Sequence, residues 1–429
     1  MEKTQIQKPA FLKGALHVIS IAAALSMAHP YRNILSLDGG GSWALIQAMA
    51  LDKLYPGESG RQVLQRFDLA IANSGGSLVL GALASDMAPA QIVTDMFLDE
   101  GRRRSIFVDT ILDPFTHAVG IGPRYKAEAK LPGLRNALNR DGKHFGDVAL
   151  EKLGDGIPGL PDIVITSFDY DRQRSVFFRS NKASKAGSGP SPAGPSLAEA
   201  LHASSNAPVN YFNAPALFQT QGYAGKRYWD GGTAGLNNPV LAGVVEAIAN
   251  GSDPAALNLL SIGTASVMLP LQDGTIKPEL AIRPAASNLF HDIGKLARTI
   301  LDDPPDAASY IAFRILHRDN DNPGIPRLVR LNPLVQPVRP VDSGTDWRYP
   351  DTLDQPYPDA SDPSAFEQLV KLDMDAVEQN QVKLIQRFCS LWLQDKVPNQ
   401  PIQSGADLSC HIGQRWFSLG DAARRKIGL

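Results

Sequence analysis

The stretch "FDLAIANSGGSLVLGALAS", residues 67–85, joins two apolar segments through one sharp turn. Its first apolar run stops at Asn73-Ser74 and continues through two glycines into a second run. A strand that turns abruptly into a helix can present a serine hydroxyl at the tip of the turn, clear of the backbone. The stretch therefore predicts a strand ending at Ala72, a helix beginning near Gly75, and Ser74 as a candidate nucleophile.

The same strand-and-turn design recurs along the first 266 residues. Apolar strands are predicted in "NILSL" (33–37), in "PDIVITSFDYD" (161–171) with a hairpin partner "VFFRS" (176–180), and over residues 257–263 of "LNLLSIGTAS". Between these strands lie segments whose apolar residues have helical spacing. Within the strands, apolar and polar residues do not alternate with a clean period of two, as expected when helices cover both faces of a sheet. The pattern predicts an α/β fold with a largely parallel central sheet.

Composition excludes several classes of protein. The 429 residues carry 42 Lys+Arg and 44 Asp+Glu, a net charge of −2, so no bulk attraction to nucleic acid or anionic lipid is expected. Hydrophobic content of 43% and charged content of 20% are ordinary for a globular protein. Cys389 and Cys410 make neither a disulfide framework nor a metal site. The sequence leaves the oligomeric state open.

Residues 1–30 allow two interpretations. Three lysines precede "GALHVISIAAALSMA" (14–28), which is typical of a secretory signal, but the segment also fits an N-terminal helix. It is too short to span a bilayer. We expect a cytoplasmic protein, with secretion as the alternative if residues 1–28 are a signal peptide.

Three glycine-rich turns are expected to meet at the carboxyl edge of the sheet, where open α/β sheets bind ligands. They are "LDGGGS" (37–42), "ANSGG" (72–76) and "YWDGGTAGLNNP" (228–239). Consecutive glycine N–H groups can hold a phosphate or the oxyanion of acyl transfer. Asp230 can accept a proton from a serine hydroxyl, or it can simply cap its own turn.

In order and spacing these turns resemble the patatin-like phospholipases, whose pattern is a D-G-G-G loop, a G-x-S-x-G elbow and a D-G-[AG] motif. Further matches are "LHASSNAPVNYF" (201–212), "NNP" (237–239) and "LSIGT" (260–264). The resemblance covers residues 31–266 and implies a three-layer α/β/α catalytic domain. It also implies a Ser74–Asp230 dyad, a lipid or phospholipid acyl ester as substrate, transient contact with a membrane surface, and neither cofactor nor metal. The implied oxyanion donors are Gly39, Gly40, Gly41 and Gly75.

The sequence departs from the family pattern at three positions. Trp43 stands where the family usually has a basic residue, Ala44 replaces the next glycine, and Ala72 replaces the first glycine of the elbow. A histidine-assisted triad is the minor alternative for the mechanism, and His291, His317 and His411 follow Asp230 in the chain order that such a triad requires. His202 is interpreted as a structural histidine, with a place in the wall of the cleft as the alternative.

Two other functions stay open. A catalytically inactive patatin-like module could bind a membrane or a partner protein. A phosphate-binding ATPase of the actin-like or sugar-kinase type could use Asp38 and Asp230 as metal ligands beside their glycines.

Residues 267–429 are predicted to form a mostly helical, loop-rich extension. Apolar spacing predicts one helix across 366–392. Arg102, Arg103 and Arg104 are interpreted as a solvated helix end, with lipid phosphate as the alternative contact. The apolar residues around them fit either a mobile cap or the core: Phe97, Ile106, Phe107, Ile111, Leu112 and Phe115.

Overall fold

The structure is a computed structural model, and it describes residues 30–106, 124–140, 142–155, 157–181, 194–208, 211–220, 222–272, 281–283, 306–317, 326–337, 363–402 and 412–429. The helix and signal-peptide interpretations of residues 1–28 therefore lie outside the described residues. So do Phe107, Ile111, Leu112 and Phe115 of the predicted cap.

An eight-stranded mixed sheet forms the centre of the fold, in the order β11-β9-β1-β2-β5-β8-β7 with β6 beside β5. Its four parallel pairings run from β11 to β5, and the pairings of β5–β6, β5–β8 and β7–β8 are antiparallel. The prediction of an α/β fold with a largely parallel sheet is confirmed. The antiparallel strands β6, β7 and β8 lie at one side of the sheet, beyond β5. The strands are β1 (Asn33–Leu37), β2 (Leu69–Ala72), β5 (Asp162–Asp169), β6 (Arg174–Arg179), β7 (Ala216–Leu217), β8 (Arg227–Asp230), β9 (Asn258–Ile262) and β11 (Leu328–Leu331).

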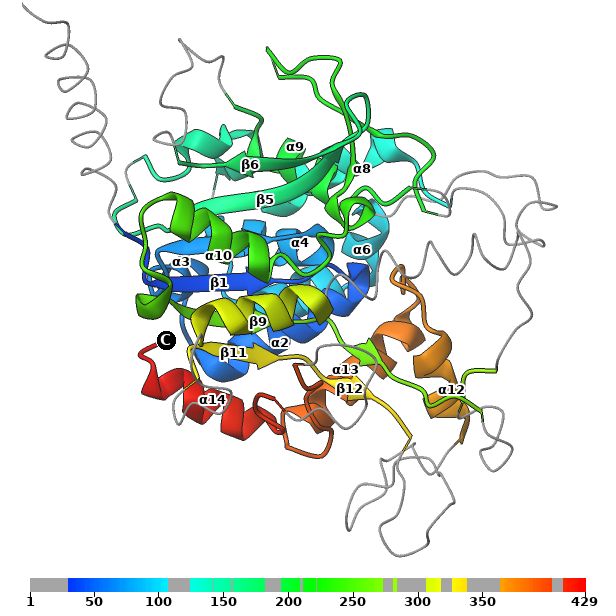
Figure 1. The fold of residues 1–429 in the computed structure, drawn as a ribbon. Coiled ribbons are helices and arrows are strands. Elements are labelled where there is room, and N and C mark those ends of the chain that lie inside the picture. The colour runs from blue at the N-terminus through cyan, green and yellow to red at the C-terminus, as the bar shows by residue number, and fades with distance from the viewer. Residues whose placement is uncertain are drawn as a thin grey trace, which may run out of the picture.

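Helices cover both faces of this sheet (Figure 1). Alternate residues of β2 separate into two apolar clusters: Ala70 and Ala72 face one layer, while Leu69 and Ile71 face the other. The first layer holds α2 (Leu45–Leu54), α4 (Ser74–Ala84) and α9 (Leu197–Ser204), and the second holds α10 (Val240–Ala249) and a helix over 306–316. This burial of both faces explains why the strands show no polar alternation.

The C-terminal region packs on the first layer through α13 (Gln379–Trp392), which contacts α2. The predicted single helix across 366–392 is wrong, because α12 (Pro363–Lys371) ends before α13 begins. Residues 372–378, here called the α12–α13 linker, are not helical, and their backbone carbonyls accept hydrogen bonds from residues 42 and 43. The Met374 carbonyl accepts from the Ser42 N–H at 2.8 Å. The Asp373 carbonyl accepts from the Trp43 indole at 3.2 Å. Tertiary hydrogen bonds thus interrupt a periodic helical sequence.

Strand β11 belongs to the region beyond the predicted boundary at residue 266, yet it pairs with β9 in the central sheet. Residues on both sides of that boundary therefore share one sheet, and α14 (Phe417–Lys426) packs against β11. In the described part of the chain, no helix is both long and apolar enough to cross a bilayer. The other helices and strands are α3 (Gly60–Leu64), α5 (Pro89–Gln91), α6 (Glu100–Ile106), α8 (Ala127–Leu138), β3 (Asn139–Arg140), β4 (Lys143–His144), β10 (Ser266–Val267) and β12 (Leu334–Val335).

Candidate active site

Ser74 lies at the turn from β2 into α4, with a backbone φ of 47°. This left-handed conformation is rare for a residue with a side chain and costs of order 1–3 kcal/mol. The turn is held by close packing, because a Cβ at Gly75 would lie 2.5 Å from the Gly41 carbonyl oxygen. The Ser74 N–H donates to Ser204 Oγ at 2.9 Å. The surrounding contacts therefore maintain a strained turn with the serine at its tip.

Asp230 ends β8, is 5% exposed, and accepts hydrogen bonds from the Gly232 N–H at 2.7 Å and from Asn73 Nδ2 at 3.1 Å. The Ser74 hydroxyl lies near enough to lower the pKa of this carboxyl. The carboxylate thus caps its own turn and also faces the serine. Burial nevertheless raises the pKa of Asp230 above its usual value, although these three groups and the Lys130 charge act in the opposite direction.

Asn73 is a site residue that sequence reasoning missed. It is fully buried, and while its amide nitrogen binds Asp230, its Oδ1 accepts from Thr166 Oγ1 at 2.7 Å. These two bonds fix which side of the amide faces the carboxylate. The available signal was its place directly before Ser74, in the turn that the sequence singled out.

The glycine loop 39–41 is anchored by a buried ion pair. Asp38 binds the Arg330 guanidinium through both carboxylate oxygens, at 2.9 and 2.5 Å, and both side chains are nearly inaccessible. Burial raises the pKa of Asp38, and the charge of Arg330 opposes that shift. Thr264 Oγ1 also donates to the Gly39 carbonyl at 2.5 Å. Residues more than 220 positions away along the chain therefore fix this loop.

The backbone N–H groups of the glycine loop do not all remain available to a ligand. The Gly39 N–H donates to the Asn237 carbonyl at 2.7 Å, so it is not available to an oxyanion in this arrangement. That leaves Gly40 and Gly41 as the candidate donors from the loop. Gly41 has a φ of 57° and packs against Gly75, the residue after the serine.

A cavity of about 30 Å³, room for one or two waters, lies beside Ser74. Part of its wall comes from the α12–α13 linker, because Met374 and Asp375 line it. Asp375 binds Arg124 at 2.7 Å and the Tyr125 hydroxyl at 3.0 Å. The other lining residues are Gly41, Gly75, Leu78, Ser205, Ala207, Tyr211 and Phe212. Sequence reasoning missed this contribution of the C-terminal region.

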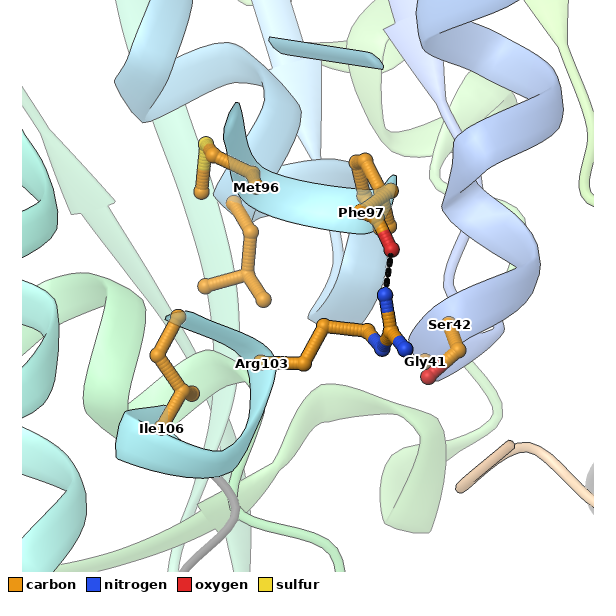
Figure 2. Close-up of a pocket in the computed structure, with 7 residues that line it drawn as sticks. Gly41, Ser42, Met96, Phe97, Arg103 and Ile106 are labelled. Carbon is orange, nitrogen blue, oxygen red and sulfur yellow. Dashed lines mark hydrogen bonds between the residues drawn. The ribbon is translucent and has the colours of Figure 1, made fainter. Parts of the chain in front are cut away.

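A second cavity, of about 10 Å³, lies under Gly41 and Ser42 and is lined by Arg103 (Figure 2). The interpretation of Arg103 as solvated is wrong: it is 2% exposed and donates to the carbonyls of Phe97 and Val377. It thereby joins α6 to the linker. Arg102 pairs with Asp95 and Asp99, and Arg104 with Glu100 and Glu378.

Of the four histidines that the sequence singles out, the structure describes His202 and His317. Burial lowers the pKa of His202 well below its usual value, so it stays neutral. His317 Nδ1 contacts the Phe313 carbonyl and its Nε2 accepts from the Arg327 N–H. His291 and His411 lie outside the described residues. Among the residues that the structure describes, no group of three His, Cys, Asp or Glu is placed to hold a metal ion.

Residues 35–244 match the family model described as patatin-like phospholipase. VipD from Legionella pneumophila is similar at 11% identity and a TM-score of 0.33, over 84% of this chain and 67% of that chain. Full-length ExoU with SpcU, from the type III secretion system of Pseudomonas aeruginosa, is similar at 16% identity and a TM-score of 0.28, over 67% of this chain. The chain spans half the length of that protein. Among curated proteins, none matches this chain.

Proposed function

Because residues 35–244 belong to the patatin-like phospholipase family, we propose that the protein is a lipid acyl hydrolase that cleaves carboxylic esters through Ser74 and Asp230. The observation that carries the proposal is the approach of the Ser74 hydroxyl to the buried Asp230 carboxylate, which Asn73, the residue before the serine, binds at 3.1 Å. A nucleophile in contact with a base, beside free backbone donors, is the arrangement that acyl transfer requires.

In the proposed reaction, Asp230 accepts the Ser74 proton as Oγ attacks the ester carbonyl. The N–H groups of Gly40, Gly41 and Gly75 hold the oxyanion, and losing one such donor typically costs about 3 kcal/mol. Asp230 then returns the proton to the leaving alcohol, and an acyl-serine forms. Water, deprotonated by Asp230, attacks the acyl-serine. Asp230 returns that proton to Oγ as the acyl–oxygen bond breaks, which releases the fatty acid and restores Ser74.

Substrate entry requires the cavity beside Ser74 to widen, because about 30 Å³ holds no acyl chain and ligand pockets usually measure about 300–1,000 Å³. The α12–α13 linker is the wall that comes from outside the matched family region. We propose that it moves when the protein meets a lipid surface. Sedimentation with phosphatidylcholine vesicles tests that contact. We also propose that the protein acts in the cytoplasm.

The ATPase alternative is disfavoured by the partners of its two aspartates. Arg330 binds both carboxylate oxygens of Asp38, and Asp230 accepts hydrogen bonds from Asn73 and from the Gly232 N–H. Neither carboxylate is free to hold the metal that such an enzyme needs. Calorimetry with Mg-ATP should show no binding.

The central test is labelling with a fluorophosphonate, which reacts with activated serines. We expect the native protein to be labelled and to hydrolyse a phospholipid ester, and Ser74→Ala to do neither. Asp230→Asn should keep the fold but lose hydrolysis, and EDTA should leave the native rate unchanged. Equal labelling of the native protein and Ser74→Ala would move the nucleophile elsewhere. No labelling of either would favour the inactive binding module.

A further inference from the structure

Lys130 is a fully buried lysine on α8, at 0% exposure. Its ammonium donates to the Ser205 carbonyl and lies 4.1 Å from the centroid of the Phe212 ring. Burying an ammonium is costly unless it has partners, and lysine is rarely found at such depth. Both of these partners also line the cavity beside Ser74. The lysine therefore lies directly behind the wall of the candidate active site.

Three successive residues connect this lysine to the site. Ser204 Oγ accepts the N–H of Ser74 at 2.9 Å, and the Asn206 carbonyl accepts the N–H of Asp230 at 3.0 Å. Between them, the Ser205 carbonyl accepts from Lys130. The turn 204–206 thus holds the backbone of the nucleophile, the backbone of the carboxylate and the ammonium group together.

The charged groups around this turn are Asp230 and Lys130. Asp230 receives hydrogen bonds only from neutral groups in the described part of the chain, and the cation that acts on it there is Lys130. His202 of α9 also faces Lys130, but it is buried and neutral, and Arg135 acts on His202 from the same helix as Lys130. Among the described residues, the ammonium is therefore the cation whose charge favours the ionised form of Asp230.

We propose that Lys130 is a positioning residue of the Ser74–Asp230 site, whose ammonium keeps Asp230 ionised and fixes the Ser205 carbonyl behind the cavity. This role rests on the proposed hydrolase function. Burial lowers the pKa of Lys130 to about 7, and the Asp230 charge works against that lowering. Both groups are therefore charged at pH values between the pKa of the carboxyl and that of the ammonium.

The first test compares Lys130→Met, Lys130→Arg and the exposed control Lys143→Met, using pH profiles of ester hydrolysis and of fluorophosphonate labelling. Without the ammonium, the pKa of Asp230 rises, so the acid limb of Lys130→Met should move up by about one pH unit. Lys130→Arg keeps the charge and should retain the native acid limb, and Lys143→Met should match the native profile. An acid limb unchanged in Lys130→Met overturns the proposal, because a purely structural lysine would lower activity equally at every pH.

A second measurement depends on neither activity nor the folding of a lysine variant. Lysines labelled with ¹³C at Cε are titrated by NMR in the native protein and in Asp230→Asn, and the Lys130 signal is assigned by its loss in Lys130→Arg. The pKa of Lys130 should fall by about one unit or more when Asp230 is neutralised. Equal values in the two proteins overturn the proposal. A coupled lysine in a protein that hydrolyses no ester and takes no label would refute the proposed function instead.

Discussion

Asn73 Nδ2 lies 3.1 Å from Asp230 Oδ1, so the residue before the candidate nucleophile holds the candidate base. The same amide accepts from Thr166 Oγ1, a residue of β5. Serine, base and central sheet are thereby joined through one buried side chain. Asn73 fixes the direction of the carboxylate while leaving its charge unchanged.

Asn73→Ala should therefore lower kcat more than it raises KM. A buried carboxylate that loses one donor loses about 1–3 kcal/mol of stabilisation, which corresponds to a fall in rate of about 5- to 150-fold. Steady-state hydrolysis of a soluble ester measures this effect. The matched control is Asn250→Ala, whose amide only caps the end of α10. A full rate in Asn73→Ala would mean that Asp230 is held by its own turn alone.

The φ of 47° at Ser74 predicts a gain in stability when the side chain is removed completely. Ser74→Gly relieves the strain, whereas Ser74→Ala keeps the Cβ that causes it. We expect the glycine variant to be more stable than the alanine variant by about 1 kcal/mol, as measured by urea unfolding. Since both variants lack the hydroxyl, lost hydrogen bonds cancel in this comparison. A glycine variant that is less stable would show that the turn carries no strain.

Asp230 predicts how activity and stability depend on pH. Only the ionised carboxylate accepts the serine proton, and burial raises its pKa above the usual value near 4. Hydrolysis should therefore fall on acidification at a higher pH than an exposed aspartate would give. Because a raised pKa in the folded state disfavours the charged form, Asp230→Asn should also raise the unfolding midpoint at pH 7.

A pH–rate profile and thermal unfolding at pH 7 test these two effects of Asp230. The exposed Asp155→Asn is the control and should change neither quantity. An acid limb at or below pH 4, or an Asp230→Asn variant of lower stability, would contradict this account of the buried charge.

The parts of the site that could be predicted from sequence are local turns. Glycine and serine within a few residues of Asp38, Ser74 and Asp230 reveal sharp bends, since few other residues adopt those conformations. Short apolar runs also reveal buried strands: the predicted strands 33–37 and 257–263 are observed as β1 (Asn33–Leu37) and β9 (Asn258–Ile262), and β2 ends at Ala72 as predicted.

The parts that could not be predicted are long-range partners. Arg330 lies 292 residues from Asp38, and its own strand gives no sign of that pairing. Apolar spacing continues smoothly across 366–392, so only the bonds from Ser42 and Trp43 reveal that the helix breaks there. Trp43 shows the same limit: the sequence marks it as a departure from the family, and the structure shows that it contacts Phe388 of α13. Tertiary contacts override local propensity at each of these positions.

The α12–α13 linker yields the last prediction. Its Asp375 is 9% exposed and holds two partners from the catalytic region, so Asp375→Ala removes a buried anchor. This loss of about 1.5–3 kcal/mol in the free energy that holds the linker on the catalytic region should raise the population of the open linker at least about tenfold. Labelling of Ser74 by a fluorophosphonate with a long alkyl chain should accelerate accordingly, because a cavity of about 30 Å³ has no room for that chain. A small fluorophosphonate should gain less.

The matched control for this linker is Glu378→Gln, which breaks a pair with Arg104 whose glutamate side chain is 64% exposed. Exposed pairs contribute about 0–1 kcal/mol, so labelling should change by less than about fivefold. Slower labelling of Asp375→Ala by both probes would mean that the linker completes the active site, because a segment that merely covers Ser74 cannot slow the reaction when it leaves. Equal acceleration of both probes would place the barrier at Ser74 itself, since only a closed wall discriminates by chain length.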